Sequence, residues 1–214
     1  MQKYVNPLLP ALMLAAILAL VSCVNSSGGE EQGSSGSEDG MQGMDNGTES
    51  TDYASEMLME NGQYSDERFI DAMIPHHQGA IEMAQVALEN AEHPEILALA
   101  EDVVASQETE IGQLKSIKQE QFGTSEASMD MSAEEMEGMG MASDPQELAN
   151  QDPFDKVFID NMTPHHESAI AMAQVVLEES ENPEIRKIAE AIVDAQEREI
   201  EQMRSWRDEW YPES

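Results

Sequence analysis

The sequence predicts an all-α protein in which two repeated αα-hairpins form one four-helix bundle. A segment containing a HisHis pair occurs twice, at a constant offset of 89 residues (165 − 76 = 89). Apolar residues recur at helical spacing along each repeat. A proline near the middle of each repeat, Pro94 or Pro183, indicates a turn between two helices.

The N-terminus has the features of an export signal. Lys3 precedes an apolar run from Leu8 to Leu20, and the tetrapeptide Leu20-Val21-Ser22-Cys23 follows, which resembles the lipobox of bacterial lipoproteins. We expect residues 1–22 to be removed and Cys23 to be acylated, which anchors the protein to the cell membrane outside the cytoplasm, in the periplasm or at the cell surface. The alternative is an ordinary signal peptide with an incidental cysteine.

Two polar segments flank the first repeat. Residues 23–62 are rich in Ser, Gly and acidic side chains, and we expect a disordered stalk because they bury too little apolar surface to offset ordering. Residues 123–151 form an acidic linker that is rich in methionine. Its methionines are either weak Cu(I) capture sites or simply part of a low-complexity tract: Met129, Met131, Met136, Met139 and Met141.

The first hairpin is expected over residues 63–122. Ser65 or Asp66 can cap its first helix, Pro75 is expected to interrupt that helix, and His93-Pro94 marks the turn. The apolar face of its second helix has helical spacing: Ile96, Ala100, Val103, Ile111 and Leu114.

The second hairpin, over residues 152–211, repeats this pattern. Pro153 begins it, Pro164 is expected to interrupt its first helix, and Asn182-Pro183 forms the turn. The last apolar stripe consists of Ile185, Ala189, Ile192, Ile200 and Met203. Because each hairpin has one uncovered apolar face, we expect the two to pack together with pseudo-two-fold symmetry.

The chain is strongly acidic. It carries 44 acidic and 10 basic residues, a formal net charge of −34. Such a charge repels nucleic-acid phosphates and anionic lipid head groups, so we expect no nucleic-acid partner and no membrane attachment except the covalent anchor. It also attracts cations, although the acidity is sufficiently explained by solubility.

The repeated motif combines imidazole and thioether groups, which are the ligands of soft or borderline metals. Helical spacing puts both histidines of a copy on the apolar side, with methionines before and after them. The candidate metal ligands are Met73, His76, His77 and Met83, with Met162, His165, His166 and Met172. The alternative is that the histidines are hydrogen-bonded core residues and the methionines fill core space.

The spacing around the histidines indicates which metal is bound. Carboxylate di-iron bundles place Glu three residues before His, whereas this chain has Met73 and Met162 at those positions. A thioether in place of a carboxylate favours copper, in the Cu(I) state above all, over Fe(II), Mn(II) or Zn(II). Four polar residues on the facing apolar stripes are expected to orient the imidazoles rather than to bind metal: Gln107, Glu110, Gln196 and Glu199.

Three motifs together resemble a known family. Met-x-Pro-His-His, the following Ala-Ile-x-Met-Ala, and Gln-x-x-Glu-Ile in the next helix are similar to the ferritin-like domain-of-unknown-function family 305, which includes exported copper-binding proteins. The resemblance covers residues 64–121 and 152–211 and implies a four-helix bundle. For some members it implies copper handling through His and Met, which on this chain are the eight candidate ligands.

We therefore expect a lipid-anchored, extracytoplasmic protein that sequesters Cu(I) or Cu(II), or hands it to a delivery partner. Binding is favoured over catalysis. The alternatives are a metal-dependent oxidoreductase on the same bundle, for instance one that oxidises Cu(I), and a structural or signalling helical module without metal.

Replacement of Cys23 tests the predicted anchor. Cys23→Ala should release the protein from the membrane fraction, because the mature chain has no other segment apolar enough to hold it. Mass spectrometry of the native protein should show cleavage before Cys23 and added acyl mass. An unmodified N-terminus at another position would refute the prediction.

Overall fold

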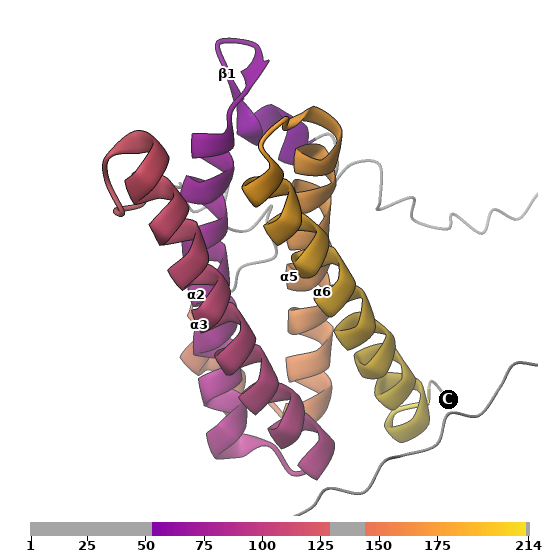
Figure 1. Ribbon diagram of the computed structural model, residues 1–214. Helices are drawn as coiled ribbons and strands as arrows, with labels where there is room; N and C mark the ends of the chain where they lie inside the picture. Colours follow the sequence, from indigo (N-terminus) through magenta and orange to yellow (C-terminus); the bar gives the residue numbers. More distant parts are fainter. Residues whose placement is uncertain (1–52, 129–143, 213–214) are drawn as a thin grey trace, which may run out of the picture. The chain divides into compact units, whose positions relative to one another are not determined.

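The computed structural model describes residues 53–128 and 144–212. Four long helices dominate it: α2 (Asp66–Asn90), α3 (Pro94–Phe122), α5 (Phe154–Glu179) and α6 (Pro183–Trp210). The pairs α2/α3 and α5/α6 are helical hairpins that lie side by side (Figure 1). The predicted helical bundle is confirmed, whereas its ferritin-like detail is not established by this arrangement.

Local sequence explains where the helices begin and end. The Ser65 side chain caps α2 by accepting a hydrogen bond from the main-chain N–H of Arg68. The Asn182 side chain caps α6 in the same way through Glu184 N–H. Gly123 ends α3 with φ = 80°, a left-handed conformation that glycine adopts without a steric penalty.

The expected interruptions at Pro75 and Pro164 do not occur. Both α2 and α5 continue through their prolines. A proline inside a helix costs about 3 kcal/mol, and burial of the neighbouring side chains compensates for it: Ile74 and His76 flank Pro75 and are almost completely enclosed. Packing between the hairpins thus outweighs the local preference of proline.

The boundaries of the polar segments also differ from the expectation. Residues 53–58 are helical, and β1 (Met59–Glu60) and β2 (Gln63–Tyr64) form a small antiparallel hairpin. Residues 53–60 of this stretch fall within the expected stalk, whereas β2 falls within the first repeat. Leu58 is fully buried in the core, which explains the order of this stretch. At the end of the linker, the 3₁₀ helix η1 (Pro145–Asn150) buries Leu148 against α2 and α5.

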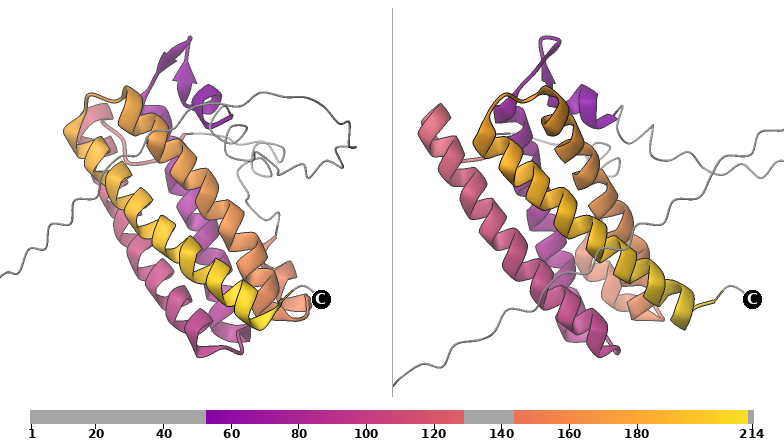
Figure 2. Two further views of the ribbon diagram at one scale, coloured as in Figure 1. Left: turned by 90° about the vertical axis from the view of Figure 1, so that its right-hand side faces the viewer. Right: turned by 45° about the vertical axis from the view of Figure 1, so that its right-hand side comes forward.

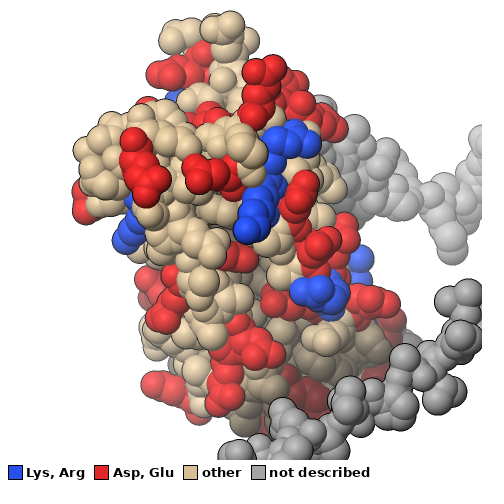
Figure 3. All heavy atoms as spheres, in the orientation of Figure 1, with Lys and Arg blue, Asp and Glu red and all other residues tan. Residues whose placement is uncertain are grey.

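Several predicted features lie outside the described residues. These are the signal peptide, Cys23, most of the stalk, and the linker methionines Met129, Met131, Met136, Met139 and Met141. Within the described ranges, none of the helices is sufficiently long and apolar to span a membrane. Acidic side chains are spread over the face of the molecule that Figure 3 shows, with few basic side chains between them.

Two apolar clusters make up the core, and each contains residues of both repeats. One joins Phe69 and Ile70 of α2 to Val175 and Ile192 of the second hairpin. The other joins Ala84 and Val103 to Phe158 and Met203. Figure 2 shows the two hairpins packed along their lengths. The hairpins therefore share one core, and neither covers its own apolar face.

A single hairpin should consequently fail to fold alone. Residues 60–122 expressed in isolation should give an unfolded chain or a dimer, because the apolar face loses the partner that covers it. Circular dichroism during heating and analytical ultracentrifugation measure this outcome. A monomer with a cooperative thermal transition would contradict the shared core.

Candidate metal centre

The two HisHis pairs meet in the middle of the bundle. The His76 and His165 rings come from α2 and α5, and their centroids are 3.8 Å apart with a tilt of 38°. His77 and His166 lie on either side, with centroids 6.4 Å and 6.2 Å from their neighbours. All four side chains are completely buried. We call these four residues the histidine layer.

The facing helices supply one carboxylate to each side of the layer. His77 Nε2 lies 2.7 Å from Glu110 Oε2, and His166 Nε2 lies 2.7 Å from Glu199 Oε2. The two contacts are related by the 89-residue offset, so the pseudo-two-fold symmetry extends to side-chain geometry. Both carboxylates are about 15% exposed, at the edge of the core. Glu110 and Glu199 thus have the positions expected for groups that orient the imidazoles.

Gln107 and Gln196 differ from the two glutamates in their side-chain contacts. Both are buried, as expected for the apolar stripe, but their side-chain oxygens have no hydrogen-bond partner. The expected contact with an imidazole is therefore not formed by these oxygens.

Ser168 is a partner that the sequence pattern did not indicate. Its hydroxyl donates to the main-chain carbonyl of His165 at 2.8 Å and lies 2.7 Å from His76 Nε2. Because a hydroxyl has one proton, Ser168 accepts from His76, which places the proton of that imidazole on Nε2. The contact joins α5 to α2, and only the relative placement of the hairpins reveals it.

Several imidazole nitrogens in the layer remain without a hydrogen bond. Nδ1 of His77 and Nδ1 of His166 are buried without a hydrogen-bond partner, and neither ring nitrogen of His165 has a side-chain partner. Where Nε2–H donates to an ionised glutamate, the Nδ1 lone pair is available to a metal. This is the donor chemistry that a metal site requires.

Five buried thioethers lie on the two sides of this layer. Met73 and Met172 belong to one apolar cluster, and Met83, Met162 and Met203 belong to the other. Each of these five is at most 1% exposed. Within residues 53–128 and 144–212, no group of three or more His, Cys, Asp or Glu side chains is arranged to hold a metal. Metal binding here must therefore be tested with methionine included among the ligands.

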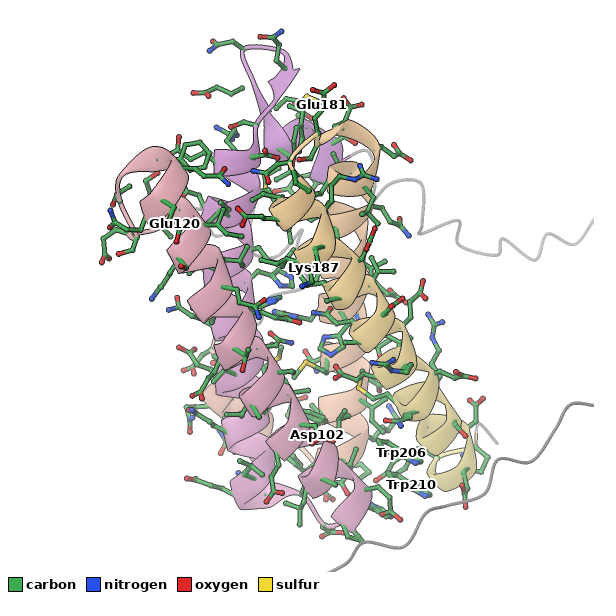
Figure 4. All side chains as sticks on the ribbon, in the orientation of Figure 1. Asp102, Glu120, Glu181, Lys187, Trp206 and Trp210 are labelled. Atoms are coloured by element: carbon green, nitrogen blue, oxygen red, sulfur yellow. The ribbon has the colours of Figure 1, made fainter. Side chains whose placement is uncertain are left out.

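The fifth histidine, His93, lies outside the layer at one end of the bundle. Its Nδ1 is 2.5 Å from the buried carboxylate of Asp155, and its ring stacks on Trp210 at 3.9 Å. Trp206 continues the stack at 5.5 Å near the C-terminal end of α6 (Figure 4). His93 thus lies at the turn between α2 and α3, as its place before Pro94 predicts, and its side chain contacts α5 and α6 rather than the histidine layer.

A family model described as a domain of unknown function (DUF305) matches residues 12–118 and 66–207. The chain belongs to the DUF305 family. Solved structures that resemble it include CopM in the Cu(I)-bound form, 39% identical over 70% of this chain and 99% of that chain with a TM-score of 0.61. For CopM in the Cu(II)-bound form the identity is 41%, the coverages are 70% and 99%, and the TM-score is 0.64.

Two other relatives have names that state no ligand. A DUF305 fragment from Deinococcus radiodurans is 28% identical, with coverages of 65% and 93% and a TM-score of 0.60. A curated mimivirus protein, the uncharacterized protein L153 of Acanthamoeba polyphaga mimivirus, is 38% identical over 55 residues, which are 26% of this chain and 36% of that protein. This DUF305 chain thus spans about a third of that curated relative.

His165 should make the metal-free protein sensitive to acid. Burial, together with the neighbouring His76, His166 and His77, holds the pKa of His165 well below its ordinary value of 6.5. The unfolded chain then binds a proton that the folded chain does not, so stability should fall as the pH drops below 6.5. The decline due to this group is at most about 1.4 kcal/mol per pH unit.

Urea denaturation of the metal-free protein across this pH range measures the effect. His165→Gln removes the titrating group and should give a shallower decline than the wild-type protein. Equal slopes in the two proteins would show that His165 does not control the acid response.

Proposed function

We propose that this protein binds copper in the histidine layer, with Cu(I) preferred, and sequesters it or passes it on outside the cytoplasm. The observation that carries the proposal is that the buried Nδ1 atoms of His77 and His166 have no hydrogen-bond partner, in a layer where His165 has no side-chain partner. An unsatisfied buried polar group costs about 1–3 kcal/mol. A metal ion bound at these nitrogens would remove that penalty.

The neighbouring groups support a soft metal. Thioether sulfur lies on both sides of the imidazoles, in an interior that contains no cysteine, since the only cysteine of the chain is Cys23. A mixed imidazole and thioether set favours Cu(I) over harder divalent ions. Glu110 and Glu199 hold the outer imidazoles through Nε2, which leaves Nδ1 as the nitrogen available for coordination.

The relatives support the same cargo. CopM has been solved with Cu(I), with Cu(II) and with silver, and it shares 38–41% identity with this chain in those forms. Export is supported by the signal sequence that the N-terminal residues predict. It is also supported by the similarity to a putative secreted DUF305 protein from Streptomyces coelicolor, which is 26% identical, with coverages of 68% and 92% and a TM-score of 0.59. Anchoring through Cys23 would keep the bound copper at the membrane surface.

Two sets of substitutions separate copper binding from a purely structural role. Replacing Met73 and Met162 with Leu should weaken Cu(I) binding with little loss of stability, because Leu conserves core volume. Replacing His76, His77, His165 and His166 with Gln should weaken both Cu(I) and Cu(II) binding.

Copper content, affinity and melting temperature should be measured on the same samples, after equilibration with Cu(I), Cu(II), Zn(II) and Fe(II) in competition. If the histidines are only structural, the Met variants will keep all their copper and the His variant will lose stability alone. Unchanged copper binding in the fourfold His variant would refute the proposal.

A further inference from the structure

The two copies of the motif are not equivalent in the folded protein. Residues that are 89 positions apart have equivalent positions in the two repeats. Where the two residues of such a pair differ near the histidine layer, the surroundings of the layer differ on its two sides. The sequence offset alone identifies these substitutions, and the structure shows which of them lie beside candidate ligands.

Contacts between helices assign each methionine to a level in the bundle. Helices α2 and α5 are antiparallel, since Asp155 at the start of α5 accepts hydrogen bonds from Glu92 and His93 just beyond the end of α2. The contact of His76 with Ser168 fixes their register. Equal numbers of residues counted from this contact, in opposite chain directions on the two helices, reach the same level. Met73 is therefore level with Ala171, which is next to Met172 in the sequence. In the same way, Met83 is level with Asn161, which is next to Met162.

The histidines lie between these two levels. The rings of His76 and His165 are 3.8 Å apart and so occupy one level, in the histidine layer. We therefore distinguish two halves of the site by their thioethers. The Met73 half consists of Met73 and Met172, the Met83 half consists of Met83 and Met162, and the histidine layer separates them.

The Met83 half contains a further thioether. The sulfur of Met203 in α6 is 4.0 Å from the Thr163 hydroxyl, next to Met162, and Met203 is completely buried in the same cluster as Met83 and Met162. Its counterpart beside the Met73 half is Leu114, also completely buried. Three thioethers thus meet near one level on one side of the layer. On the other side Met73 and Met172 lie at the matching level, whereas the third buried methionine of that cluster, Met57, lies beside Arg68 near the start of α2.

The two inner imidazoles also differ. Ser168 accepts a hydrogen bond from Nε2 of His76, but its counterpart Gly79 offers no side chain to His165. His165, which approaches the main chain of His76, therefore has no side-chain hydrogen-bond partner. An ion in the Met83 half would thus have the larger number of sulfur donors and, in the adjoining histidine layer, an imidazole that no side chain engages.

We propose that a soft monovalent ion, Cu(I) or Ag(I), occupies the Met83 half first, and that Met203 is a ligand of this subsite. This inference rests on the proposed function of the histidine layer. Thioether donors favour soft ions, so a third sulfur raises the affinity of one half above that of the other.

Silver titration of the full mature chain, carrying ¹³C-labelled methionine methyl groups, tests the order of binding. Ag(I) is diamagnetic, and the methyl resonances can be assigned by single Met→Leu substitutions. The methyl groups of Met83, Met162 and Met203 should shift at the first additions of Ag(I), before those of Met73 and Met172. Simultaneous shifts in both halves, or earlier shifts of Met73 and Met172, would overturn the proposal.

The chain offers a matched pair of variants for the affinity. Replacing a residue that only orients a metal ligand weakens metal affinity about 10–100-fold. Because Met203 is proposed to bind the metal directly, Met203→Leu should weaken binding of the first Cu(I) by at least about tenfold. Leu114→Met, at the corresponding place, should tighten binding of the second ion. Both substitutions conserve core volume, so the melting temperature should change little.

The outcomes separate this inference from the proposed function. A wild-type protein that binds neither Cu(I) nor Ag(I) would refute copper binding in the layer altogether. A wild-type protein that binds copper, with affinity unaffected by Met203→Leu, would refute only the role of Met203. If Met203→Leu disturbs folding, the Leu114→Met variant and the silver titration of the wild-type protein still test whether the Met83 half binds the first ion.

Discussion

The structure depends on the burial of four imidazoles between two apolar clusters. A buried polar ring must find partners, and each hairpin provides one internally, through Glu110 for His77 and Glu199 for His166. The inner rings, His76 and His165, contact each other across the hairpins. The histidine layer is therefore both the candidate metal centre and the place where the two repeats meet. Relative movement of the hairpins would change the geometry of every donor in it.

The sequence was informative wherever a feature depends on local pattern. Spacing predicted the helices, and the 89-residue offset predicted that Glu110 and Glu199 would take matching roles. Features that depend on the register between hairpins were not predictable. The contact between Ser168 and His76 is an example, since it joins residues 92 positions apart. Helix continuity at Pro75 and Pro164 likewise depends on packing that no local propensity encodes.

The duplication explains how such a site can arise and then diverge. Two equal copies give a symmetric layer, and single substitutions then make its sides unequal without disturbing the bundle. The same divergence has occurred at the ends of the helices. At one end His93 stacks on Trp210, whereas the corresponding pair at the other end, Asn182 and Gln121, forms an amide hydrogen bond of 2.8 Å. Stable packing thus tolerates chemical differences at matching places.

Copper K-edge X-ray absorption spectroscopy of the Cu(I)-loaded protein tests the central claim most directly, because it reports the elements bound to the metal. Coordination within the histidine layer predicts a first shell that contains both imidazole nitrogen and thioether sulfur, with the multiple-scattering pattern of imidazole. The fourfold His variant should lose that pattern. A first shell of oxygen alone, as carboxylates of the acidic surface would give, would contradict the claim that the buried His and Met side chains hold the metal.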